Sequence, residues 1–235
     1  MTYLLRRKLP VIVCIIAAFG VLFLCGILNK NESAENAASI PISGKTVVID
    51  AGHGGFDAGA SANGLEEKNI NLSVAKYLKE YIAQGGGIAV MTRNEDKSTA
   101  DADTGGKSAK KSDLENRKKL VETSEADVFV SIHMNKFPQE QYKGAQVFYS
   151  SQPAESKVLG EMIQESLKEI LNDGNERQAK KSDDIFILKN TLVPSVIAEC
   201  GFLSNPGEAE LLKDEKYRQK LAWGIYVGIV KFFNR

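Results

Sequence analysis

Apolar and polar positions along residues 44–235 follow a pattern that predicts strands separated by helices. Short runs of β-branched and other apolar residues, bounded by polar or glycine-rich segments, indicate buried strands. These runs cover residues 45–50, 88–92, 127–133, 145–150 and 194–200. Segments with apolar residues three or four positions apart predict helices over residues 69–84, 114–124, 155–172 and 206–233, the last as one helix or two. This order favours an α/β fold with a mostly parallel, twisted sheet and helices on both faces.

Polar segments connect these elements, and the charge balance limits the partners of the chain. Residues 94–112 are polar and predict a loop, while the lysines of 107–111 and of 180–181 are expected on solvated loop or helix faces. Hydrophobic residues make up 43% and charged residues 26%, and 30 basic side chains balance 30 acidic ones. With no net charge, the chain has no overall field that would attract nucleic acid.

The N-terminal segment has a different character from the rest. Arg6, Arg7 and Lys8 precede a stretch of 20 residues, 9–28, without a charge. This length crosses a bilayer, and the basic flank orients the N-terminus towards the cytoplasm. We therefore expect residues 1–28 to be a membrane anchor or a cleaved signal sequence, 29–43 a linker, and 44–235 a domain exported outside the cytoplasmic membrane.

The two histidines of the chain follow two of the predicted strands. His53 comes shortly after strand 45–50, and His133 ends strand 127–133. Because ligands bind beyond the carboxyl ends of parallel strands, both imidazoles are expected at one edge of the sheet. Two imidazoles and one carboxylate are a common ligand set for zinc and leave a fourth position for water. The sequence therefore predicts a metal site at this edge.

Several acidic residues are candidates for the chemistry of this site. Glu66 and Glu67 both precede the helix at 69–84, and spacing does not choose between them as the third ligand. Glu199 ends the apolar strand 194–200, where a buried carboxylate needs a partner or a task, either a structural salt bridge or general acid/base catalysis.

Other residues have weaker claims to the site. The candidates for contacts to the substrate or to the metal ligands are Arg93, Arg117 and Asn135, although Arg93 could equally form a surface salt bridge. Cys200 is the lone cysteine after the apolar N-terminal segment, so residues 44–235 hold no internal disulfide, and we expect a buried thiol rather than a nucleophile. The motifs of nucleotide-binding loops and of serine hydrolases are absent.

Six segments of the chain carry a resemblance to a known family. They are VVIDAGHGGFDAGA, GLEEKNINLSVAKYL, MTRNED, ENRKKLV, ADVFVSIHMN and IAECGFLSNPGEAELL. In this order they resemble the zinc-dependent N-acetylmuramoyl-L-alanine amidases over essentially all of 44–235. Within that family the chain is most similar to the spore-cortex amidases of the CwlD type, through PISGK, FPQEQYKGAQVFYS and the apolar N-terminal segment.

The resemblance implies specific roles for residues of this chain. One zinc ion would be bound by His53, Glu67 and His133, which favours Glu67 over Glu66, and Glu199 would be the catalytic acid/base. The implied substrate is the amide joining the lactyl group of muramic acid to L-alanine in peptidoglycan, and the implied destination is the forespore or cortex space, on the route to muramic-δ-lactam. A zinc peptidase acting within the stem peptide and a catalytically weak wall-binding protein are the alternatives.

No added glycan-binding module follows or precedes the predicted domain within the sequence. We therefore expect access to the wall to depend on the N-terminal membrane segment or on an auxiliary protein.

Overall fold

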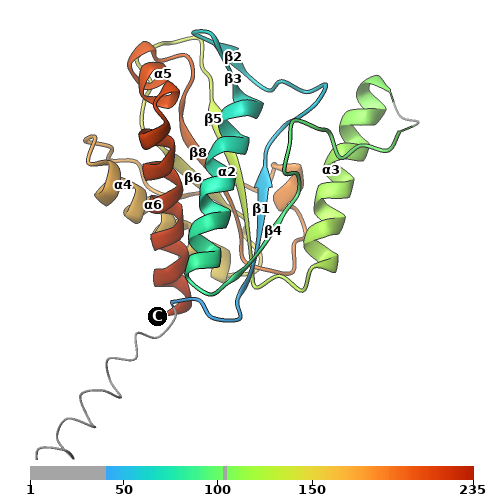
Figure 1. Cartoon of the computed structure of the whole chain (residues 1–235). Coiled ribbons are helices and arrows are strands. Elements are labelled where there is room, and N and C mark those ends of the chain that lie inside the picture. Colours follow the sequence, from blue (N-terminus) through green and yellow to red (C-terminus); the bar gives the residue numbers. More distant parts are fainter. Residues whose placement is uncertain (1–40, 103–104) are drawn as a thin grey trace, which may run out of the picture. The chain divides into compact units, whose positions relative to one another are not determined.

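A six-stranded sheet forms the centre of the fold (Figure 1). The computed structural model describes residues 41–102 and 105–235. Across the sheet the strands are β4 (Ile88–Met91), β1 (Thr46–Ala51), β5 (Val128–Asn135), β8 (Ser195–Phe202), β6 (Gln146–Tyr149) and β7 (Lys180–Lys181). β4, β1, β5 and β8 are parallel, β6 is antiparallel to β8, and β7 is parallel to β6. The prediction of a mostly parallel sheet is confirmed.

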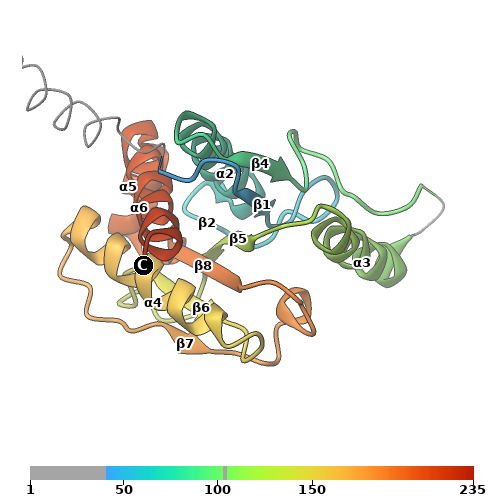
Figure 2. The same cartoon turned by 90° about the horizontal axis from the view of Figure 1, so that it is seen from below.

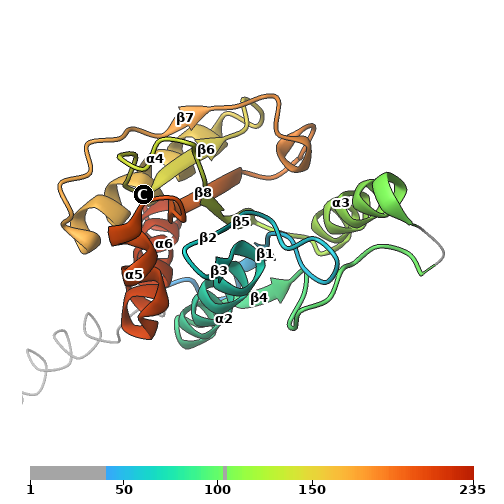
Figure 3. The same cartoon turned by 90° about the horizontal axis from the view of Figure 1, so that it is seen from above.

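Helices cover both faces of this sheet. The helical elements are α2 (Glu67–Gln84), α3 (Gly106–Thr123), α4 (Glu155–Leu171), the 3₁₀ helix η1 (Phe186–Leu188), α5 (Pro206–Lys213) and α6 (Glu215–Phe233). In the views from below and from above, α2, α4 and α6 lie on one side of the sheet and α3 on the other (Figures 2 and 3). One face of each central strand packs with α2, α4 and α6, and the other with α3 and η1. Burial on both faces explains why these strands are apolar throughout.

The helix α3 begins earlier than its sequence predicts. Residues 106–112 were expected to belong to a loop but form its first two turns. Their inward face contains Ala109 and Ser112, and Asp113 follows directly. Asp113 Oδ1 accepts hydrogen bonds from Ser98 Oγ at 2.7 Å and Thr99 N at 2.6 Å. Polar contacts bury this face of the helix, so apolar residues do not recur along it every three or four positions. The hydrophobic pattern therefore did not reveal it.

The C-terminal segment forms two helices, which was one of the two expectations. Asp214 separates them, and its side chain accepts from Lys216 N at 3.0 Å as the N-cap of α6. Tyr226 and Phe232 are buried, whereas Trp223 is 43% exposed and makes an edge contact with Tyr81.

The N-terminal boundary of the packed unit also differs from the expected linker. Ile42, expected in the linker, is buried in the core beside α2 and donates its backbone N–H to Gly85 O. The expected membrane segment at 1–28 lies outside the described residues. Among 41–102 and 105–235, no helix has the length and apolar character needed to cross a membrane.

Candidate metal centre

The strands β1, β5 and β8 are neighbours in the sheet, and their carboxyl ends lie at the same edge (Figure 3). His53, His133 and Glu199 lie at this edge. His133 and Glu199 are register partners on neighbouring parallel strands, so their side chains project side by side from the same face. Both strands continue beyond these residues, to Asn135 and Phe202, although the sequence predicted that His133 and Glu199 end their strands. β1 ends at Ala51 and leads directly into the loop that contains His53.

His53 is held in an uncommon backbone conformation. Its φ of 62° lies in the left-handed region, which a non-glycine residue adopts at a cost. Its Nδ1 lies 2.9 Å from Asp57 Oδ2, and its Nε2 lies 3.2 Å from Glu67 Oε2. A carboxylate that binds one ring nitrogen fixes the tautomer and directs the other nitrogen towards a metal.

Glu67, the first residue of α2, lies between the two histidines. Its Oε2 accepts from Ala60 N at 2.8 Å, and its Oε1 accepts from Met134 N at 3.1 Å and lies 2.9 Å from His133 Nδ1. Glu66, by contrast, is exposed and accepts from Asn69 Nδ2 at 3.1 Å. The helix α2 begins two residues before its predicted start and buries Glu67, which favours Glu67 over Glu66 as the third ligand.

These three side chains form a donor set that suits a metal ion. One ligand atom from each of His53, Glu67 and His133 lies within 4.8 Å of the others. Burial would raise the pKa of Glu67, but hydrogen bonds from His133 and His53 hold it far below its ordinary value. Burial would lower the pKa of His133, yet the carboxylates of Glu67 and Glu199 raise it. Concentrated negative charge beside two imidazoles is what a divalent cation would neutralise.

Glu199 has a carboxyl oxygen without a partner. Its Oε2 is buried and makes no hydrogen bond within the described part of the chain. Burial raises the pKa of this carboxyl, and the charge of Glu67 raises it further, while His133 and His53 oppose the shift. A carboxyl group that is buried beside a donor set and is free to exchange a proton suits general acid/base catalysis.

Two buried arginines hold the loop that carries His53. Arg117 Nη2 donates to His53 O at 2.6 Å, and its Nη1 donates to Ala51 O at 2.8 Å. Arg93 Nε also donates to Ala51 O at 2.8 Å, and Arg93 Nη2 donates to Gly52 O at 3.1 Å. Both side chains lie beneath the loop and hold its backbone.

Comparison with known proteins supports the same conclusion as the geometry. The sequence pattern of the family described as N-acetylmuramoyl-L-alanine amidase matches residues 47–231. The chain belongs to this family. It is also 38% identical to the germination-specific N-acetylmuramoyl-L-alanine amidase of Bacillus subtilis, over 98% of this chain and 97% of that protein. It is therefore a hydrolase of the amidase class.

Solved structures of this family share the fold. The CwlD amidase from Clostridioides difficile, solved in complex with the GerS lipoprotein, superimposes with a TM-score of 0.79 at 44% identity, covering 81% of this chain and 98% of that one. An N-acetylmuramoyl-L-alanine amidase from Clostridium difficile 630 gives a TM-score of 0.72 at 28% identity, covering 82% of this chain and 98% of that one. The α/β architecture is thus that of the amidase structures.

Two supporting residues of the amidase site were not found from the sequence. They are Asp57, which orients His53, and the buried Asn71, whose Nδ2 donates to Gly52 O at 3.1 Å and to Glu67 Oε1 at 3.3 Å. Asp57 lies four residues after His53 in a glycine-rich loop, and Asn71 lies one helical turn after Glu67. Their spacing from these candidate ligands is the feature of the sequence that could have identified them. Asn135, predicted as a contact residue, accepts from Lys136 N at 2.9 Å through its side chain.

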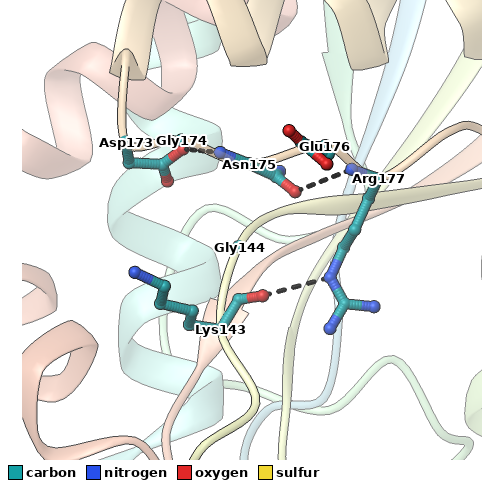
Figure 4. A pocket seen from close by; sticks show the side chains of 7 residues that line it. All are labelled: Lys143, Gly144, Asp173, Gly174, Asn175, Glu176 and Arg177. Carbon is teal, nitrogen blue, oxygen red and sulfur yellow. Dashed lines mark hydrogen bonds between the residues drawn. The ribbon is translucent and has the colours of Figure 1, made fainter.

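The amidase also has a pocket of about 330 Å³ that none of the three candidate ligands lines. Figure 4 shows its lining residues, Lys143, Gly144, Asp173, Gly174, Asn175, Glu176 and Arg177. Arg177 Nε donates to Lys143 O at 3.1 Å, and Asn175 Oδ1 accepts from Arg177 N at 3.0 Å. Its acidic and basic side chains balance, and its polar groups bond to one another.

Proposed function

We propose that the chain is a zinc-dependent amidase that hydrolyses the bond between the lactyl group of muramic acid and L-alanine in the peptidoglycan of the spore cortex. One observation carries this proposal. His53, Glu67 and His133 bring their ligand atoms within 4.8 Å of one another, and Glu199 is the register partner of His133 on the next strand.

The residues present fit a zinc ion. Two imidazoles and one ionised carboxylate are ligands that zinc prefers, and three protein ligands leave a position open for water or substrate. When bound, the zinc ion would acidify a water molecule and polarise the carbonyl of the scissile amide. Asp57 would hold His53 by Nδ1, leaving Nε2 for the metal.

Glu199 supplies the proton transfers in this proposal. Its carboxylate accepts a proton from the attacking water and returns it to the amide nitrogen of L-alanine as that group leaves. Burial favours the protonated carboxyl, which helps Glu199 keep the proton between these two steps. Cys200 takes no part, because it is buried and burial raises the pKa of its thiol.

The spore cortex is supported by the relatives. The protein from Bacillus subtilis is named a germination-specific amidase, and it matches this chain almost end to end. The CwlD amidase of Clostridioides difficile was solved with a lipoprotein, which supports the expectation of an auxiliary protein. Residues 1–28 would place the domain outside the cytoplasmic membrane, as an anchor or as a signal sequence.

Mass spectrometry of the reaction products tests this function. Peptidoglycan and isolated spore cortex would be treated with zinc-loaded protein, with and without a chelator. The proposal predicts stem peptides that carry a free L-alanine amine, released only when zinc is present. Fragments cut within the stem peptide would indicate a zinc peptidase instead. Bound zinc without any product, with either substrate and with the auxiliary protein added, would favour a wall-binding protein.

A further inference from the structure

Four lysines lie on one side of α3. Lys107, Lys110, Lys111 and Lys118 share a helix face with Leu114, because the five residues are separated by three, one, three and four positions. We call these four lysines the lysine row. The side chains of Lys110 and Lys111 are 58% and 73% exposed. A row of exposed cations on one helix face can attract an anionic ligand.

An apolar hollow accompanies the lysine row. A pocket of about 290 Å³ is lined by Lys107, Lys110, Lys111, Leu114 and Phe186. Phe186 belongs to η1 and is 41% exposed, and Lys118 Nζ lies 5.9 Å from the centre of its ring. The pocket therefore offers an aromatic and aliphatic floor with positive charge around it, which suits a ligand with carboxylates on aliphatic stems.

The lysine row reaches the candidate metal centre. Lys110 Nζ lies 3.2 Å from Asp57 Oδ2, and that oxygen lies 2.9 Å from His53 Nδ1. Two contacts thus connect the pocket to a metal ligand. The distance from His53 to Lys110 lies within the reach of a few residues of an extended peptide, which spans about 3.3–3.6 Å per residue.

Half of the positive charge on the row is not neutralised. The acidic groups that face it are Asp57, paired with Lys110, and Glu115, whose Oε1 lies 3.6 Å from Lys111 Nζ. Within the residues that the structure describes, Lys107 and Lys118 have no carboxylate at ion-pair distance. Four cations against two anions leave an excess of positive charge beside the site.

We propose that the lysine row and its pocket bind the free carboxylates of the stem peptide, on the leaving-group side of the scissile amide. This inference rests on the proposed amidase function and names the part of the substrate that the chain recognises. An anionic membrane would also be attracted to lysines, but a bilayer on this row would lie against the loop that carries His53. The contact between Lys110 and Asp57 therefore favours a substrate peptide.

A binding experiment with the free stem peptide tests the proposal without requiring turnover. The zinc-loaded full chain, in an uncharged detergent, is titrated by calorimetry with an acidic stem peptide and with the same peptide carrying carboxamides. The test variant is Lys107→Ala/Lys111→Ala. The matched control is Lys157→Ala/Lys220→Ala on α4 and α6, across the sheet, where Lys157 pairs with Glu161 as Lys111 does with Glu115. Thermal melting confirms that each variant is folded.

We expect the acidic peptide to bind the unchanged chain about tenfold more tightly than the carboxamide peptide, because its carboxylates form exposed ion pairs with the lysines and carboxamides do not. The test variant should reduce this preference to less than about twofold, and the control should keep it. A preference that survives in the test variant overturns the proposal. The proposal is also overturned if the test variant loses binding to phosphatidylglycerol vesicles while its peptide binding is unchanged. That result would indicate that the lysine row binds membranes. Failure of the amidase function would appear separately, as absence of products from peptidoglycan.

Discussion

At the scale of single residues, the site depends on side chains that never contact a metal. Arg117 is 2% exposed and lies between Asp50 and Asp113, with its Nη1 and Nε each 2.7 Å from a carboxylate oxygen. It also donates to the carbonyl oxygen of His53. A residue with positive φ persists only where its surroundings hold it. Arg117 provides this support for His53.

Replacing Arg117 with lysine should weaken zinc binding. Arg117→Lys keeps the charge but loses the planar fork that reaches two carboxylates and two carbonyls. We expect a loss of about 2–4 kcal/mol in the free energy of unfolding and a zinc Kd raised about 10- to 100-fold. Chemical denaturation and competition with a chelating dye measure the two effects.

A matched control is Arg218→Lys. Arg218 also donates to two backbone carbonyls, of Leu212 and Lys213, and its Nε donates to Ser73 Oγ on α2 at 2.9 Å. None of these groups belongs to a candidate ligand or to the loop that carries His53. This variant should lose stability and keep its zinc affinity. If Arg117→Lys behaved in the same way, the support of His53 by Arg117 would be refuted.

At the scale of elements, the end of β1 packs directly against the side chain carried by β5. A Cβ atom on Gly52 would lie 2.2 Å from His133 Nε2, so the ring occupies the space that any larger residue would need. A Cβ on Gly59 would likewise lie 2.6 Å from Glu67 Oε2. The glycine-rich loop thus lets the backbone approach two of the candidate ligands closely.

Gly52→Ala should therefore disrupt the metal centre without changing a ligand. The added methyl group must displace the His133 ring, and we expect zinc affinity to fall at least about tenfold and stability to fall by about 1–3 kcal/mol. The control Gly105→Ala introduces a Cβ that has no neighbour within 4 Å among the residues that the structure describes. Zinc content after dialysis measures the effect, and wild-type retention of zinc in Gly52→Ala would contradict the packing described.

The elements that the sequence predicted best are those with apolar patterns. β1, β5 and β8 are buried runs rich in β-branched residues, and β4 is an apolar edge strand with Met91 buried; the predicted bounds of all four lie within two residues of the observed ones. The hairpin of β2 (Ser61–Ala62) and β3 (Leu65–Glu66) was missed, as was β7, since two-residue strands have no period to detect.

The sequence predicted those residues of the site whose type allows few chemical roles. His53 and His133 are the two histidines of the chain, and both lie at the predicted edge. Asp57 and Asn71 are polar residues among many, and their roles depend on contacts that form in three dimensions. The resemblance favoured Glu67 over Glu66, and the position of α2 supplies the physical reason.

At the scale of the whole molecule, a buried ion cluster joins α3 to the sheet. Burial would raise the pKa of Asp113, but hydrogen bonding and charge from Arg117 lower it below its ordinary value of 3.8. Asp50 on β1 behaves similarly: burial opposes the shift, and Arg117 lowers the pKa of its carboxyl. Groups with a depressed pKa in the folded state stabilise the fold above their unfolded pKa and lose this contribution as pH falls through the folded value.

The metal-free protein should accordingly lose stability in acid through this cluster. At pH 6 we expect Asp113→Asn to unfold more easily by about 2 kcal/mol, because a hydrogen bond to a charged group is removed. Between pH 4 and pH 2 this difference should shrink as Asp113 itself becomes protonated. Urea denaturation of both proteins across this range measures it, and a difference that does not change with pH would show that Asp113 is not ionised in the fold.

The central claim assigns metal binding to His53, Glu67 and His133 and proton transfer to Glu199. Zinc content and release of the L-alanine amine, measured together on Glu199→Gln, test this division most directly. The account predicts about one zinc ion per chain, as in the unchanged protein, with turnover reduced at least about 100-fold, because glutamine has the shape of glutamate but cannot accept the proton. Turnover equal to that of the unchanged protein would contradict the role of Glu199, and loss of zinc would show that Glu199 belongs to the metal centre itself.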